Sequence, residues 1–211
     1  NTPTAPMLRR CVQLTHQIFK IMYKLFSVLI LFFLSITCRS QTGVYKTYID
    51  YQNRSILPMD SILDFEMSIS GTKIFFLNTQ KKKETYKTKQ MWGFVYKGHL
   101  FRCFDSDFSE VIDTGRICYY ESGIAHLRSI NTHDRFGYFR YGNVMYLSKD
   151  LNSKYYDSYK KFCKEYPEVQ DFEECLKISK PKMIANSNNE EDFTQYIKDM
   201  RKCVASFNSH K

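Results

Sequence analysis

The sequence predicts an α+β domain: an antiparallel, aromatic-rich β-meander preceded by a signal peptide and followed by two or three helices. Three observations predict it. An apolar run lies near the start, short aromatic or β-branched segments alternate with glycine-bearing turns, and helical periodicity begins after residue 148. A meander with one aromatic face must curl into a barrel or fold into two layers to bury that face.

The apolar run extends from Leu25 to Ile36 and follows two lysines. It is shorter than the roughly 20 apolar residues that a membrane-spanning helix needs. Residues 22–40 are therefore interpreted as a secretory signal peptide, cut between Ser40 and Gln41. Acylation of Cys38 and an uncleaved anchor are the alternatives. We expect the mature chain in the periplasm, on the cell surface or outside the cell.

Residues 1–21 precede this segment, and we interpret them as upstream read-through or a basic leader, because Met22 would open a signal peptide of ordinary length. The first forty residues hold five of the 31 Lys and Arg residues and no acid. The rest, residues 41–211, carries 26 basic and 22 acidic residues, a net charge of +4 instead of +9. This mild balance does not indicate nucleic-acid binding. Membrane contact is expected only through the signal peptide before cleavage.

Residues 41–63 are predicted to be an N-terminal arm. A weak helical stripe indicates a short helix or turn at Tyr48–Gln52, and Pro58 is expected to end this region. The arm would lead into the β domain at residues 64–148.

Four hairpins are predicted in that β domain, each an apolar strand pair closed by a turn that contains glycine. They pair Phe65–Ser70 with Lys73–Asn78, Trp92–Tyr96 with Leu100–Phe104, Ile117–Glu121 with Ile124–Arg128, and Phe136–Tyr141 with Val144–Leu147. Together they predict a meander of about eight strands. The lysine run at residues 81–83 fits a solvated hairpin tip.

Residues 149–211 are predicted to be helical, because apolar residues recur there every three or four positions. We expect one helix along Leu151–Tyr166, ended by Pro167, and a shorter one at Asp171–Ile178. A polar connector, Lys180–Asn189, precedes the last helix. That helix must pack on the sheet or on its helical neighbour, since it carries a stripe of six apolar residues: Phe193, Tyr196, Ile197, Met200, Val204 and Phe207.

Five cysteines follow the signal peptide: Cys103, Cys118, Cys163, Cys175 and Cys203. In an exported chain this odd number allows at most two disulfides and leaves one thiol over. Their spacing does not determine the pairing. The alternative is that they are small buried hydrophobic residues.

The strand at Trp92-Gly93-Phe94-Val95-Tyr96 is the most distinctive stretch. Trp92, Phe94 and Tyr96 are predicted to share one face, on which a sugar or a lipid could stack. Core packing is the alternative use of such an aromatic strip. The stretch resembles a single copy of a WG-type repeat.

A broader resemblance rests on the segment Gly43–Tyr51, on Trp92-Gly93-Phe94 and on residues 115–120. These motifs are similar to those of a group of uncharacterised exported proteins from the Bacteroidota. The resemblance implies export and a β-rich domain followed by helices. It implies no activity.

Candidate catalytic residues are few, and they lie in different predicted elements: Asp105 and Asp107 in one turn, His126 in a later strand, and His133 with Asp134 in a connection. Neither a metal-binding spacing nor a nucleotide-binding motif occurs, so we expect no metal and no cofactor. The sequence favours a non-enzymatic exported protein that acts by binding or as an envelope component, with an unknown ligand and partner. The alternative is an exported hydrolase with a carboxylate or histidine site at the sheet rim. A cleft that holds at least three of these residues would favour the hydrolase.

Overall fold

The computed structural model describes residues 22–23, 41–132, 145–179 and 190–209. The chain divides into two units, residues 1–40 and residues 41–211. The second unit begins at the residue that the sequence predicts to follow signal cleavage. None of the helices within the described ranges is long and apolar enough to cross a membrane.

The strands of the second unit are β1 (Gly43–Tyr45), β2 (Leu57–Glu66), β3 (Lys73–Asn78), β4 (Lys83–Lys87), β5 (Gly93–Tyr96), β6 (His99–Phe104), β7 (Asp107–Asp113), β8 (Cys118–Ser122) and β9 (Met145–Ser148). Its helices are α2 (Tyr48–Gln52), η1 (Thr88–Gln90), α3 (Gly123–Thr132), α5 (Tyr159–Glu165), η2 (Pro167–Val169), α6 (Gln170–Ser179) and α7 (Glu190–Ser209). The predicted α+β class is confirmed.

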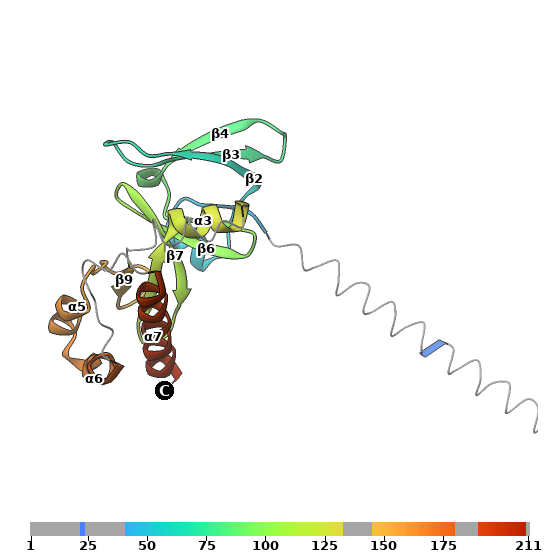
Figure 1. Ribbon diagram of the computed structural model, residues 1–211. Helices are drawn as coiled ribbons and strands as arrows, with labels where there is room; N and C mark the ends of the chain where they lie inside the picture. Colours follow the sequence, from blue (N-terminus) through green and yellow to red (C-terminus); the bar gives the residue numbers. More distant parts are fainter. Residues whose placement is uncertain (1–21, 24–40, 133–144, 180–189, 210–211) are drawn as a thin grey trace, which may run out of the picture. The chain divides into compact units, whose positions relative to one another are not determined.

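All nine strands form one antiparallel sheet in the order β4-β3-β2-β1-β5-β6-β7-β8-β9 (Figure 1). The sheet is open, with β4 and β9 at its edges, and is not closed into a barrel. In Figure 1, β2 to β4 lie at one end of this unit, and α5 to α7 lie at the other.

The N-terminal arm expected at residues 41–63 is instead built into the middle of the sheet. Strand β1 pairs with β2 on one side and with β5 on the other. Gly43 allows this close pairing, since a Cβ atom there would lie 2.5 Å from the carbonyl oxygen of Leu57. Helix α2 is confirmed at the expected residues, and Thr47 and Asp50 form a capping box at its start.

The first predicted hairpin forms, but its first strand was misplaced: β2 runs through Pro58 and shares only Phe65 and Glu66 with the predicted strand Phe65–Ser70. The β3–β4 hairpin was predicted only as a hairpin tip at residues 81–83, without strand β4. Its turn contains Lys81 and Lys82, which are exposed as expected for a hairpin tip. The β5–β6 hairpin is confirmed, and its turn consists of Lys97 and Gly98.

The third predicted hairpin is wrong in its second half, because residues 124–128 belong to helix α3. Strand β8 pairs instead with β7 and β9. Ile124 and Leu127 lie three residues apart and are both buried, which a helix achieves and a half-buried strand does not. Gly123 at the helix start packs against Phe108, where a Cβ atom would clash at 2.3 Å. The fourth predicted hairpin lies mostly outside the described residues.

The helix predicted along Leu151–Tyr166 is shorter than expected and begins only at Tyr159. The preceding segment, residues 149–158, is not helical and is called the strap below. Asp150 Oδ1 accepts hydrogen bonds from the backbone N–H groups of Asn152 and Ser153 (2.7 and 2.8 Å). Tyr156 then forms a β-bridge with Leu147. These local bonds satisfy the backbone without a helix.

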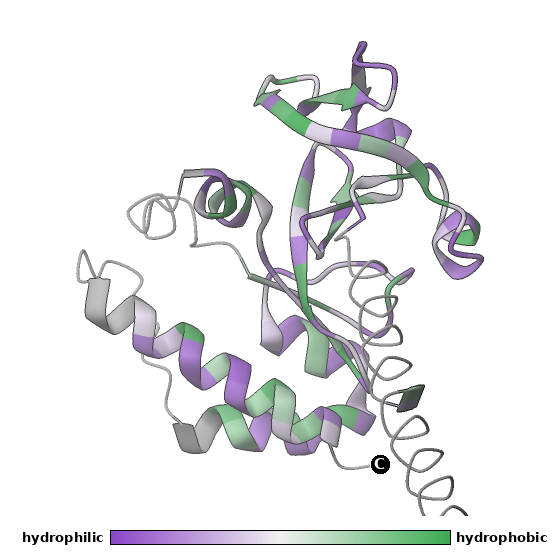
Figure 2. Cartoon of the chain, turned by 90° about the vertical axis from the view of Figure 1, so that its right-hand side faces the viewer, coloured by the Kyte–Doolittle hydropathy of each residue, from purple (hydrophilic) through white to green (hydrophobic). Residues whose placement is uncertain are grey.

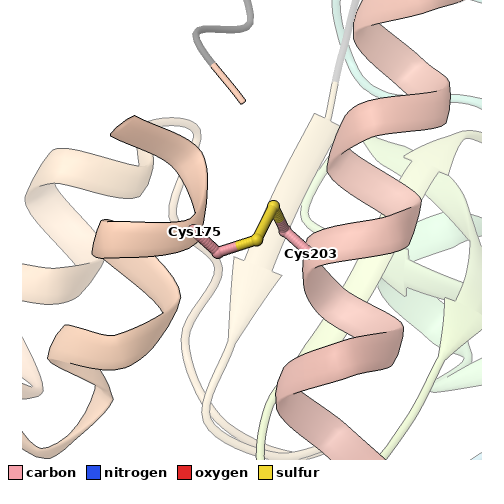
Figure 3. The surroundings of a disulfide bond; sticks show 2 residues. All are labelled: Cys175 and Cys203. Carbon is pink, nitrogen blue, oxygen red and sulfur yellow. A yellow bond between two sulfur atoms is a disulfide. The ribbon is translucent and has the colours of Figure 1, made fainter. Parts of the chain in front are cut away.

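The other predicted helices are confirmed as α6 and α7, and the connector between them lies outside the described residues. Hydrophilic and hydrophobic residues alternate along the C-terminal helices (Figure 2). A disulfide between Cys175 and Cys203 joins α6 to α7 (Figure 3). The remaining described cysteines, Cys103, Cys118 and Cys163, are buried thiols.

The domain has two hydrophobic clusters. One packs β-strand residues such as Phe76, Phe94 and Phe101 against Leu127 of α3. The other packs Tyr119 and Leu147 of β8 and β9 against α5, α6 and α7. The docked, amphipathic last helix expected from the sequence is therefore confirmed: Tyr196, Ile197, Met200, Val204 and Phe207 are all buried.

Candidate functional site

The predicted aromatic binding strip does not form a shared surface. Phe94 is fully buried and its ring stacks on Phe101 at 4.8 Å between centroids. Tyr96 is 5% exposed, and its hydroxyl donates to Asn131 Oδ1 at 2.7 Å. Both residues belong to the core. Trp92 lies apart from them, and its ring stacks on Tyr51 of α2 at 4.6 Å.

Of the predicted hydrolase residues, the three that the structure describes, Asp105, Asp107 and His126, do not contact one another. Asp105 is exposed in the turn between β6 and β7, and Asp107 Oδ1 accepts a hydrogen bond from the N–H of Phe108 (2.8 Å). His126 lies in α3, where it pairs with two glutamates that the sequence prediction did not include. His133 and Asp134 lie outside the described residues.

The structure instead brings together five ionisable side chains from five elements, called the ionic network below. They are His99 of β6, Glu110 of β7, His126 of α3, Glu121 of β8 and Arg201 of α7. His99 Nδ1 lies 2.7 Å from Glu110 Oε1, and His126 Nδ1 contacts Glu110 Oε2. His126 Nε2 lies 2.9 Å from Glu121 Oε2. Arg201 donates to both oxygens of Glu121, each at 2.7 Å.

The strand register explains why a cation is needed at the centre of this network. Glu110 and Glu121 are direct partners across β7 and β8, and like charges in that position repel each other. The carboxylates are almost fully buried, with side-chain exposures of 8% and 1%. Helix α3 starts directly after β8 and places the His126 ring where it contacts both. The ring offsets the repulsion between the strands.

The contacts of His126 define its charge. Both ring nitrogens face a carboxylate oxygen, so both donate and the imidazole is protonated. Burial alone would lower the pKa of His126, but the hydrogen bonds and charges of Glu110 and Glu121 outweigh burial and raise it to about 9. Burial would raise the pKa of Glu110, yet His126 and His99 hold it below its usual value.

One end of the ionic network opens into a surface pocket of about 360 Å³. Of the two network residues that line this pocket, His99 is more exposed than Glu110, with 44% of its side chain accessible. No described residue bonds to His99 Nε2, while Glu110 fixes Nδ1. The pocket is lined by Tyr51, Gly98, His99, Leu100, Glu110, Val111, Ile112, Asp113 and Thr114.

This arrangement presents a fixed histidine and a second carboxylate, Asp113, to a ligand. Asp113 also accepts a hydrogen bond from Asn208 of α7 at 3.2 Å. Within the described ranges, no group of three or more His, Cys, Asp or Glu side chains could hold a metal ion. A second pocket, of about 200 Å³, lies beside the disulfide and is lined by Arg116, Asp171, Cys175, Cys203, Ser206 and Phe207.

Sequence reasoning missed Glu110, Glu121 and Arg201, which come together across separations of 11 and 80 residues. The one local signal is that Glu121 follows an apolar run, Cys118–Tyr120, in a strand that is buried along its whole length. A charged residue in such a strand requires a partner. Which residues become that partner depends on how α3 and α7 pack against the sheet.

In comparisons with protein-family models, curated proteins and solved structures, nothing matches this chain. The resemblance to exported Bacteroidota proteins therefore stays a prediction. What the site can do follows from its geometry.

Proposed function

We propose that this chain is an exported, non-enzymatic binding protein that takes a small polar ligand at the His99 pocket. The observation that carries the proposal is His99 itself, which is held at Nδ1 by Glu110 and presents Nε2 to an open pocket. A side chain fixed in this way loses little entropy when a ligand binds. Glu110, which fixes His99, is itself held by His126 in the buried part of the ionic network.

Binding fits the pocket better than catalysis does. The residues that line it include no Ser, Cys or Lys, which leaves the Thr114 hydroxyl and the Asp113 carboxylate as possible nucleophiles, and Asp113 Oδ1 already accepts a hydrogen bond from Asn208. Both oxygens of Glu110 already contact histidines, so this carboxylate is not free to accept a proton from a substrate. What remains is a set of hydrogen-bonding groups held in place.

The ligand class follows from the pocket's size and charge. Its volume of about 360 Å³ lies within the usual range of about 300–1,000 Å³ for small-molecule sites. Asp113 makes one wall acidic, and Tyr51 contributes a ring on which a flat or sugar-like group can stack. A ligand rich in hydrogen-bond donors, of the size of a monosaccharide or an amino acid, suits these groups.

Export is part of the same proposal. The Cys175–Cys203 disulfide supports an oxidising compartment such as the periplasm or the cell exterior. The unit boundary after Ser40 coincides with the proposed cleavage site before Gln41. Intact mass of the exported protein tests this. A mass that starts at Gln41 is expected, whereas a retained leader or a lipid on Cys38 would reject the plain secretory route.

Ligand binding is tested by thermal shift with a panel of monosaccharides, amino acids and polyamines. At least one compound should raise the melting temperature of the wild type and of Lys97→Ala, a control in the adjacent turn. The same compound should leave His99→Ala unchanged. A shift that survives in His99→Ala would place the ligand elsewhere.

A second candidate function is an exported hydrolase with its site at the sheet rim, and the His99–Glu110 pair favours it. A carboxylate that orients a histidine leaves the second ring nitrogen to activate water as a general base. Turnover of nitrophenyl esters or glycosides that disappears in His99→Ala, while the variant keeps its fold, would establish this function. Absence of turnover with a retained thermal shift would establish binding.

A further inference from the structure

Arg102 is a charged residue in the interior of the sheet. Only 5% of it is exposed, and it lies on β6 between Phe101 and Cys103. Three aromatic rings surround its guanidinium: Phe104 at 4.5 Å, Tyr155 at 4.8 Å and Trp92 at 5.9 Å. We call this group the Arg102 cage. Tyr155 comes from the strap, and its ring stacks on Phe104 with 3.4 Å between centroids.

Among the described residues, no carboxylate forms an ion pair or a hydrogen bond with Arg102. Its Nη1 donates to the hydroxyl of Tyr120 (3.2 Å) and its Nη2 to the carbonyl oxygen of Ser153 (3.1 Å), and both acceptors are neutral. Asp150 of the strap directs Oδ1 to backbone N–H groups instead. Burial would raise the pKa of Asp150, but hydrogen bonds from Ser153 and Asn152 and, to a smaller extent, the charge of Arg102 hold it below its usual value. The rings offset part of the desolvation cost of the cation. A buried charge is ordinarily balanced by a counter-charge.

Hydrogen bonding in the Arg102 cage is also incomplete. Arg102 Nε, Trp92 Nε1 and Tyr155 Oη are all buried, and none of them bonds to a described residue. The only other such atom in the described part of the chain is Glu110 Oε2, which faces His126. Each of the three cage atoms can donate a hydrogen bond. Unpaired buried donors around a cation indicate a missing acceptor.

We propose that the Arg102 cage binds a small monovalent anion, either a halide or a carboxylate as small as formate. Such an ion supplies both things that the cage lacks, a negative charge and acceptor capacity for several donors. Its hydrogen bond from a guanidinium is of the stronger, charge-assisted type. Because the strap contributes Ser153 and Tyr155, it closes the site over the sheet.

This anion site is separate from the proposed ligand pocket. The Arg102 cage shares no residue with the lining of the His99 pocket. If no ligand binds at His99, the anion proposal is unaffected, and if no anion binds at Arg102, the proposal for the His99 pocket is unaffected.

The chain has one tryptophan, Trp92, so its fluorescence reports on the Arg102 cage and on Tyr51 of the His99 pocket, on which its ring stacks. We would titrate the mature protein with sodium bromide at constant ionic strength, using sodium gluconate, a large monovalent anion, as the balancing salt. We expect the quenching of Trp92 by bromide to have two components. One saturates, because it comes from bound bromide, and the other is linear, because it comes from collisions with free bromide. A strictly linear curve for the wild type would overturn the proposal. Formate that displaces bromide would show that the site also accepts a small carboxylate, and bromide that formate does not displace would limit the site to halides.

Variants locate the site. Arg102→Met should weaken the saturable component about tenfold or more, since it removes a charged donor. Tyr155→Phe keeps the stacked ring and should weaken it about fivefold. Arg116→Met, which removes an exposed arginine above Phe207, should behave as wild type. Equal quenching in Arg102→Met and wild type would contradict the assignment.

A crystal soaked in bromide decides the case even if Arg102→Met does not fold. An anomalous peak within hydrogen-bond distance of Arg102 Nε or Trp92 Nε1 is the expected result. A water at that position, with no bromide signal, would overturn the proposal.

Discussion

The same sheet contains two buried charge clusters of opposite design. In the ionic network, Glu110 and Glu121 both contact the protonated His126, Glu121 also contacts Arg201, and His99 hydrogen-bonds to Glu110. In the Arg102 cage, the cation meets aromatic rings and neutral oxygens, and three polar atoms stay unpaired. The network also joins α3 and α7 to the sheet, whereas the cage involves the sheet and the strap.

The comparison indicates that buried charges serve two different purposes in this domain. A fully paired cluster needs no external ion, so its removal should cost stability, and its buried members hold its exposed member, His99, in place. A cluster with unpaired donors is incomplete, so its removal should cost little stability but should abolish binding of an external ion.

The largest effect is expected at the centre of the ionic network. Glu121→Gln leaves His126 and Arg201 without their shared counter-charge and should lower the free energy of unfolding by about 3–5 kcal/mol. Chemical denaturation measures this. Glu168→Gln is the matched control, because it breaks an exposed pair with Lys149 (2.7 Å) and should leave stability unchanged. Equal effects of the two variants would show that the network is not a stabilising unit.

The second-largest effect is expected in the pH dependence of stability, because the pKa values of His126 and Glu110 in the ionic network are shifted. The pKa of His126 is raised from 6.5 to about 9, so its contribution of about 3 kcal/mol is complete below pH 6.5 and is lost as pH rises toward 9. The pKa of Glu110 is lowered from 4.5, so its contribution is present above pH 4.5 and is lost in acid. The difference in unfolding free energy between wild type and His126→Gln should shrink between pH 6.5 and 9. A constant difference would refute the charged His126.

Removing the charge of Arg102 should lower the free energy of unfolding much less than Glu121→Gln does. Arg102→Met replaces a buried, unpaired cation with an apolar chain of similar length, a change that is often neutral. With gluconate as the only anion, denaturation should show a loss of about 1 kcal/mol or less. A loss as large as that of Glu121→Gln would mean that the rings alone balance the charge, and the contrast between the clusters would fail.

The smallest change in stability is expected for His99→Ala. Its pair with Glu110 is partly exposed on the histidine side, and such pairs contribute about 0–1 kcal/mol. Denaturation should give a change at the low end of that range, while the thermal shift by the pocket ligand disappears. A large loss of stability would assign His99 to the fold and not to the pocket.

Local patterns predicted a good part of this fold. Lys97 and Gly98 form the predicted hairpin turn between β5 and β6, and the apolar stripe of α7 is buried as its spacing indicates. Helix α3 was misjudged because Ser122 and Gly123 look like a hairpin turn in isolation. They are instead the end of a strand and the start of a helix, since Gly123 must fit beneath Phe108.

The charged clusters could not be predicted in the same way. Arg201 lies 80 residues from Glu121, and only the docking of α7 brings the two together. Arg102 carried a readable signal, a charge between the apolar residues Phe101 and Cys103, and all three of these successive residues are buried. That signal indicates a buried charge but not the rings around it, because Tyr155 arrives from a segment whose periodicity wrongly indicated a helix.

The protonation of His126 separates the two designs most directly, and an NMR titration of its imidazole measures it. With both ring nitrogens donating to carboxylates, the midpoint should lie near pH 9 in the wild type and fall in Glu121→Gln. A wild-type midpoint at or below 6.5 would mean that His126 is neutral at physiological pH, and that Glu110 and Glu121 face each other without a cation between them.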